Sequence, residues 1–146
     1  MNVYKIQTIQ FIVMVIVGIL FNPMNILAYR IKDLYLSTTL IYSGLLMASV
    51  MMCAHEIIHY LTMGHFNKYV FFTGIFLSIF ISIVFLRNQL VVSDKQWLKR
   101  MIPHHSTALT TSHKIYNKTN NPALKKLAKN IIDTQEKEIK LMKSML

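Results

Sequence analysis

Residues 35–54 read YLSTTLIYSGLLMASVMMCA and contain no charged side chain. A helix that crosses the core of a bilayer needs about 20 apolar residues, within a range of about 17–25. Residues 69–86, YVFFTGIFLSIFISIVFL, and residues 6–29 are also free of charge, although Pro23 interrupts the latter. A cleaved signal peptide is the alternative for residues 6–29, but the run is long and lacks a small-x-small cleavage pattern. The sequence therefore predicts three membrane helices, over about residues 6–29, 36–63 and 69–90.

The composition agrees with a membrane protein. The chain has 146 residues, of which 53% are hydrophobic and 15% are charged, whereas soluble domains are about 45–50% apolar and about 25% charged. A disordered chain and an ordinary soluble enzyme are therefore excluded. The only cysteine, Cys53, rules out an intramolecular disulfide framework and a zinc site made of cysteines alone.

Residues 93–146 form a second, basic part of the chain, with eleven Lys or Arg and four Asp or Glu. Asp94 is a suitable N-cap for a helix that extends to about Tyr116. A turn follows, and Asn121 before Pro122 predicts the start of another helix. We therefore expect an all-α protein, in which residues 1–92 are a membrane domain and residues 93–146 form an antiparallel helical hairpin.

The two helices of this hairpin carry side chains that bind metals. A seven-residue repeat places Glu138 and Met142 in the apolar stripe of the last helix, where an unpaired carboxylate would be costly. On the preceding helix Met101 and His105 share a face, and His104 lies beside them. Facing imidazole, thioether and carboxylate groups are typical of a metal site in a helical bundle. The alternative is that the histidines are exposed near a kink and the methionines fill the core.

Three segments of this region resemble a known family. They are DKQWLKRMIPHH at residues 94–105, NPALKKLAKNII at residues 121–132 and QEKEIKLM at residues 135–142. Together they resemble the ferritin-like family catalogued as domain of unknown function 305. Three preceding membrane helices are similar to the arrangement in a membrane-anchored branch of that family.

The resemblance implies a ferritin-like half-bundle that binds copper through His and Met, often in exported proteins. Carried over by position, the implied ligands are Met101, His104 and His105, with Glu138 and Met142 facing them. Many members have a methionine six residues after the second histidine, where this chain has Thr111. The site would then be weaker, or it would be completed by His113 or by another subunit.

The second membrane helix carries a further candidate site. Met52, His55, His59 and Met63 follow steps of three and four, so they form one stripe that could hold a soft cation such as Cu(I). The alternative is a helix end that is wetted by lipid headgroups.

The same residues also match a protease pattern. His55, Glu56 and His59 fit the H-E-x-x-H pattern of zinc proteases, but three membrane helices are too few to enclose a substrate cleft. A di-iron site is excluded because the membrane helices lack further glutamates.

These observations predict an integral, multi-pass membrane protein that binds or buffers a transition metal and is not an enzyme. The alternatives are a scaffold with a basic tail that docks on lipid or protein and, more remotely, an intramembrane protease. We expect a homodimer or higher oligomer, because one hairpin buries too little apolar area. Nucleic acid is not expected as a partner, since one Trp and scattered lysines form no stacking surface. The positive-inside rule places residues 93–146 in the cytoplasm, whereas the family resemblance favours the outer face of the membrane. We expect these residues on the outer face.

Overall fold

The computed structural model describes residues 3–146 and confirms the all-α fold. No strand occurs within these residues. Contacts divide the chain into two compact units. The membrane unit comprises the chain up to Phe21 together with Thr38–Val91, and the C-terminal unit comprises Asn22–Ser37 together with Val92–Leu146.

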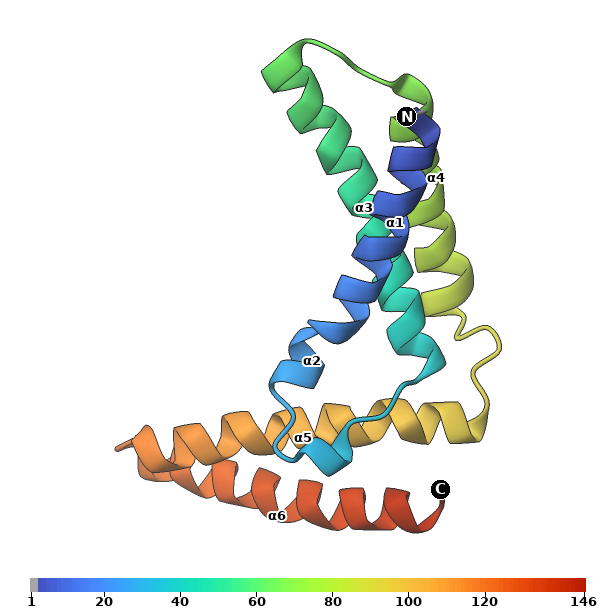
Figure 1. The fold of residues 1–146 in the computed structure, drawn as a ribbon. Helices are drawn as coiled ribbons and strands as arrows, with labels where there is room; N and C mark the ends of the chain where they lie inside the picture. The colour runs from blue at the N-terminus through green and yellow to red at the C-terminus, as the bar shows by residue number, and fades with distance from the viewer. Residues whose placement is uncertain (1–2) are drawn as a thin grey trace. The chain divides into compact units, whose positions relative to one another are not determined.

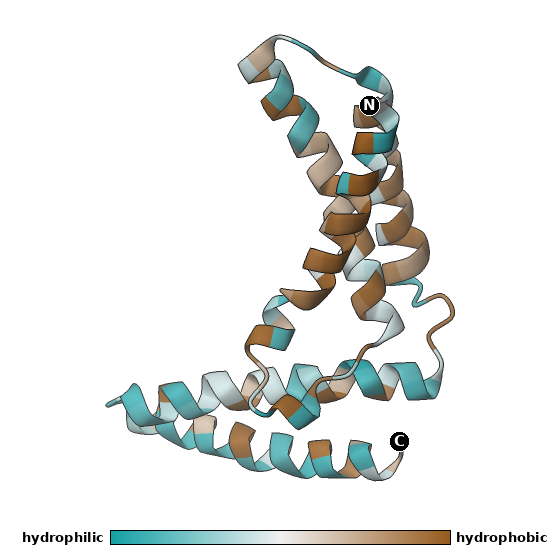
Figure 2. Cartoon of the chain, viewed as in Figure 1, coloured by the Kyte–Doolittle hydropathy of each residue, from teal (hydrophilic) through white to brown (hydrophobic). Residues whose placement is uncertain are grey.

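The membrane unit consists of α1 (Val3–Leu20), α3 (Thr38–Met63) and α4 (Lys68–Phe80), and α4 continues as the π-helix η2 (Ile81–Arg87). Three segments are long and apolar enough to cross a bilayer, namely Tyr4–Ile26, Thr38–Met63 and Lys68–Arg87. Figure 2 shows the apolar residues concentrated along these helices. The expected three long apolar helices are thus confirmed, and their composition fits contact with membrane lipid.

Glycines allow the helices of the membrane unit to approach closely. A Cβ atom on Gly44 of α3 would lie 2.8 Å from Ile19 Cγ1 and 3.0 Å from the Val15 carbonyl oxygen of α1. A Cβ atom on Gly74 of α4 would lie 2.9 Å from the Ser49 carbonyl oxygen of α3. Small residues at helix contacts are typical of membrane bundles. Lipid tails are as apolar as the side chains, so helices associate through close packing and not through the hydrophobic effect.

The first helix ends earlier than the sequence predicts. The predicted helix over residues 6–29 is split into α1 and the short α2 (Pro23–Ile26). The side chain of Asn22 accepts a hydrogen bond from the backbone N–H of Met24 at 3.0 Å and caps α2. Pro23 lacks an N–H group, so it begins a helix more readily than it continues one. As a result residues 22–37, which the sequence analysis included in the membrane domain, group with the C-terminal unit.

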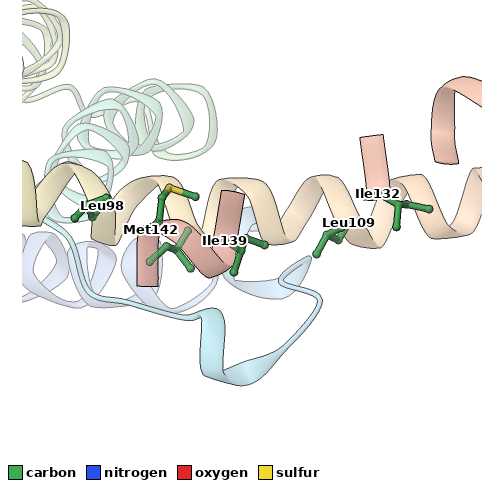
Figure 3. Close-up of a cluster of buried hydrophobic side chains, with 6 residues drawn as sticks. Leu98, Leu109, Ile132, Ile139 and Met142 are labelled. Carbon is green, nitrogen blue, oxygen red and sulfur yellow. The ribbon is translucent and has the colours of Figure 1, made fainter. Parts of the chain in front are cut away.

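The C-terminal unit contains the hairpin of α5 (Asp94–Lys118) and α6 (Pro122–Ser144) (Figure 1). Ser93 occupies the cap position that we expected for Asp94, whereas Asn121 caps α6 as predicted. Pro103 lies within α5, which continues through it. The buried core consists of Leu98, Ile102 and Leu109 from α5 and Ile132, Ile139 and Met142 from α6 (Figure 3).

Residues 22–37 are attached to this hairpin by buried polar contacts. Asp33, in the short helix η1 (Ile31–Asp33), is completely buried. Its carboxylate accepts hydrogen bonds from Ser106 Oγ at 2.7 Å and from Lys143 Nζ at 2.5 Å. Ser106 Oγ in turn accepts a hydrogen bond from the backbone N–H of Tyr29 at 2.9 Å. Each buried polar group in this network therefore has a partner, as burial requires.

Candidate metal centre

The centre of the predicted site is a contact between α5 and α6. The antiparallel hairpin places His105 opposite Glu138, and His105 Nδ1 lies 3.0 Å from Glu138 Oε2. This is the distance of an ion pair, although the ring nitrogen is not aligned for a hydrogen bond. The His105 side chain is 13% exposed and that of Glu138 is 45% exposed. The carboxylate in the apolar stripe thus lies next to an imidazole of the facing helix.

The electrostatic environment favours the neutral form of His105. Burial lowers the pKa of His105, and the neighbouring His104 lowers it further, while Glu138 acts in the opposite direction. Removal from water penalises the charged imidazolium. A metal ion binds the neutral imidazole, so His105 is suited to act as a ligand at neutral and mildly acidic pH.

The predicted sulfur ligands lie in the adjoining core. Met142 is 6% exposed and belongs to the buried cluster of α5 and α6, and Met101 is partly buried against the same cluster. Figure 3 shows the Met142 side chain at the end of this cluster near Leu98. Met145, the C-cap residue of α6, is 61% exposed. Two thioethers are therefore held within the hairpin.

The other histidines of the hairpin are placed differently. His104 is exposed, with its ring centre 5.9 Å from that of His105. The ring of His113 is stacked on that of Tyr29, with centres 4.8 Å apart. His113 is thus engaged elsewhere, and Thr111 is exposed and makes local hydrogen bonds to its own helix. Within residues 3–146 no three His, Cys, Asp or Glu side chains are already arranged to hold a metal ion.

Sequence reasoning missed the buried network around Asp33. The sequence signal was available, because Asp33 and Glu56 are the only acidic residues before Asp94. Lys143, in the last turn of α6, donates hydrogen bonds to both Asp33 and the Lys32 carbonyl oxygen. The network ties residues 22–37 to the hairpin that carries His105.

The second candidate site, in the membrane unit, is only partly assembled as predicted. His55 and His59 stack with ring centres 5.9 Å apart, and Glu56 is buried beside them. Met63 is 73% exposed, and Met52 shares a pocket with His55 but not with His59. Both Glu56 oxygens accept hydrogen bonds, one from Gln7 Nε2 at 3.2 Å and one from the backbone N–H of Asn67 at 2.9 Å. The stripe of histidines and methionines therefore does not form one cluster.

Comparison with known proteins gave two matches. A family model described as "Domain of unknown function (DUF305)" matches residues 86–146. The chain is also similar to "Uncharacterized protein L153" of Acanthamoeba polyphaga mimivirus, with 39% identity over 126 residues that cover 86% of this chain and 81% of that protein. No solved structure matches significantly. The match to the viral protein extends well beyond the C-terminal hairpin, because it covers most of both chains.

Proposed function

This chain belongs to the DUF305 family, and we propose that it is a membrane protein that binds or buffers a transition metal, namely copper. The metal is bound in the C-terminal unit, with Met101, His104, His105, Glu138 and Met142 as the ligand set. The observation that carries the proposal is the contact of His105 with Glu138 in a hairpin whose core contains Met142 and has Met101 packed against it.

The chemistry of these side chains favours copper over harder cations. Imidazole suits copper and zinc, and thioethers favour Cu(I) in particular, whereas Mg²⁺ and Ca²⁺ prefer oxygen ligands. The lowered pKa of His105 keeps its imidazole free of a proton. His104, which is exposed next to His105, can turn toward a bound ion without disturbing the core. Glu138 supplies negative charge at the rim of the site.

A second copy of the hairpin would complete a four-helix bundle. The hairpin leaves large apolar side chains on its surface, with Leu127, Leu141 and Met145 of α6 each more than half exposed. Exposed apolar area of this kind is typical of an interaction surface. A homodimer through these residues is therefore part of the proposal.

The test is the copper content of the full-length protein in detergent after loading under reducing conditions. We expect the wild type to bind copper and the His104→Ala/His105→Ala variant to bind fewer copper ions per chain while still fractionating with membranes. His113→Ala is the matched control. It removes an imidazole from the same helix, and this imidazole is stacked on Tyr29. Copper stoichiometry that is unchanged in the double variant would refute the site. Absence of copper from the wild type would favour a scaffold with a basic docking tail.

A further inference from the structure

Three histidines gather at one end of the membrane unit. His55 and His59 lie near the end of α3, and His65 lies in the short connection to α4. They line a pocket of about 300 Å³ together with Gln7 of α1, Glu56 and Asn67. This end of the unit is the one at which α1 begins, because Gln7 contacts Glu56 there. From the sequence we expected His55 and His59 to group with methionines, and His65 was not among the predicted ligands.

The spacing of the imidazoles is close to that of a metal site. The ring centres of His55 and His59 are 5.9 Å apart, and those of His59 and His65 are 5.7 Å apart. Two imidazoles bound to one tetrahedral Zn²⁺, with Zn–N distances of about 2.0–2.1 Å, have ring centres roughly 5 Å apart. Convergence on one ion therefore requires the rings to turn as well as to approach, because those of His55 and His59 are stacked with only 17° between their planes. His65 is exposed in the connection, so its side chain is free to turn.

The hydrogen bonds around two of the rings leave nitrogens available to a metal. His59 Nδ1 lies 3.1 Å from the His65 carbonyl oxygen, which can only accept a hydrogen bond. The proton of neutral His59 is thereby fixed on Nδ1, and the lone pair is on Nε2. A backbone carbonyl on the second nitrogen is the usual arrangement for a histidine ligand. The Nδ1 atom of His55 is buried and makes no hydrogen bond in the described part of the chain.

Glu56 holds the connecting segment in place. Its side chain is buried, and its two oxygens accept hydrogen bonds from Gln7 Nε2 and from the backbone N–H of Asn67. The Asn67 side chain in turn caps α4 by accepting hydrogen bonds from Tyr69 and Val70. Glu56 thus joins α1, α3 and the segment that carries His65. Its position next to His55 also places a negative charge near a bound cation.

We infer that His55, His59 and His65 form a second metal site, which binds a divalent transition-metal ion such as Zn²⁺ at the pocket end of the membrane unit. Three imidazoles with one open position suit Zn²⁺, Cu²⁺ or Ni²⁺. Glu56 is a positioning residue for this site. The inference is independent of the proposed copper site, since the two share no residue.

The test uses full-length protein in which only these three histidines remain. The chain has six histidines, so His104→Ala, His105→Ala and His113→Ala together leave His55, His59 and His65. Titration of this background protein with Zn²⁺ in detergent should show one ion per chain. A further His59→Ala or His65→Ala change should weaken Zn²⁺ binding by more than tenfold. Thr62→Ala, on an exposed position of the same helix, is the matched control and should leave the affinity unchanged.

Two further measurements keep the inference falsifiable if a histidine variant folds poorly. The electron paramagnetic resonance spectrum of the background protein loaded with Cu²⁺ should show coupling to imidazole nitrogens. Glu56→Gln should weaken Zn²⁺ binding while these nitrogen couplings persist. Failure of the background protein to bind Zn²⁺, binding that is unchanged without His59 and His65, or a Cu²⁺ spectrum with no nitrogen coupling would each overturn the inference. None of these results bears on copper binding in the C-terminal unit.

Discussion

The two units of this protein bring their helices together by different means. In the membrane unit, glycines such as Gly44 and Gly74 let backbones approach, and many large apolar side chains point outward. In the C-terminal unit, α5 and α6 are held by an interior of leucine and isoleucine. The difference follows from the solvent, because burial of apolar surface stabilises helix contacts in water but not in lipid. An isoleucine should therefore contribute more to packing in the C-terminal unit than on the outer face of the membrane helices.

The two units also differ in how they bury an acidic residue. Asp33 in the C-terminal unit is paired with the charged Lys143. Glu56 in the membrane unit instead accepts hydrogen bonds from the neutral Gln7 and Asn67. Both arrangements satisfy the carboxylate, but only the first adds a charge pair. Loss of Asp33 would leave the charged Lys143 without its partner, whereas loss of Glu56 would leave only neutral hydrogen-bond donors without an acceptor.

The largest expected effect is that of Ile102→Ala, which removes a fully buried side chain from the hairpin. Lost burial and the resulting cavity should lower the free energy of unfolding of the C-terminal unit by about 2–5 kcal/mol. Denaturant unfolding followed by circular dichroism measures this change. Ile16→Ala, at a position of α1 that is 51% exposed, is the control in the membrane unit and should cost much less. Equal costs for the two variants would break the comparison between the units.

The next effect is that of Asp33→Asn, which leaves Lys143 without its charged partner. We expect a loss of about 2–3 kcal/mol, somewhat below the value of about 3–5 kcal/mol for a fully buried pair, because Lys143 is partly exposed. A double-mutant cycle with Lys143→Met, followed by thermal unfolding, measures the coupling directly. Additive effects of the two substitutions would show that the pair does not hold residues 22–37 on the hairpin.

These residues illustrate what the sequence could and could not predict. Charge-free runs and the Asn121–Pro122 start signal are local patterns, and they predicted the long apolar helices and the start of α6 correctly. The docking of residues 22–37 depends on Asp33 and Lys143, which are 110 positions apart, so no local pattern could reveal it. For the same reason the stacking of His113 on Tyr29 was not foreseen. The facing of His105 and Glu138 was predictable, because the seven-residue repeat of the last helix and the four-residue spacing of Met101 and His105 fixed the faces of an antiparallel pair.

A smaller effect is expected from Gly74→Ala in the membrane unit. The added Cβ atom would lie 2.7 Å from Cys53 Sγ and 2.9 Å from the Ser49 carbonyl oxygen. One of these contacts is with backbone, so α3 and α4 must separate, at a cost of about 1–3 kcal/mol. Unfolding in detergent with a chaotropic additive measures the loss, and Thr73→Ala at the neighbouring exposed position is the control. A stabilised variant would contradict the role given to glycine.

The smallest effect is the pH dependence that arises from His105. Because burial lowers the pKa of His105 in the folded protein, the unfolded chain takes up its proton first as the pH falls below about 6.5. The contribution of His105 to the free energy of unfolding of the C-terminal unit should therefore rise with pH up to about 6.5 and remain constant above that pH. His105→Gln should flatten this part of the profile by less than about 1 kcal/mol, as measured by thermal unfolding between pH 5 and pH 8. A profile that becomes steeper in the variant would contradict the direction of the shift.

The most direct test of the central claim is the X-ray absorption spectrum of copper bound to the C-terminal unit of the full-length protein. The sample should carry His55→Ala, His59→Ala and His65→Ala, so that all copper is bound outside the membrane histidines. The account predicts a copper ion with both nitrogen and sulfur neighbours, and loss of the sulfur signal in a Met101→Leu/Met142→Leu variant. A copper environment of oxygen and nitrogen alone, unchanged by the methionine substitutions, would contradict it.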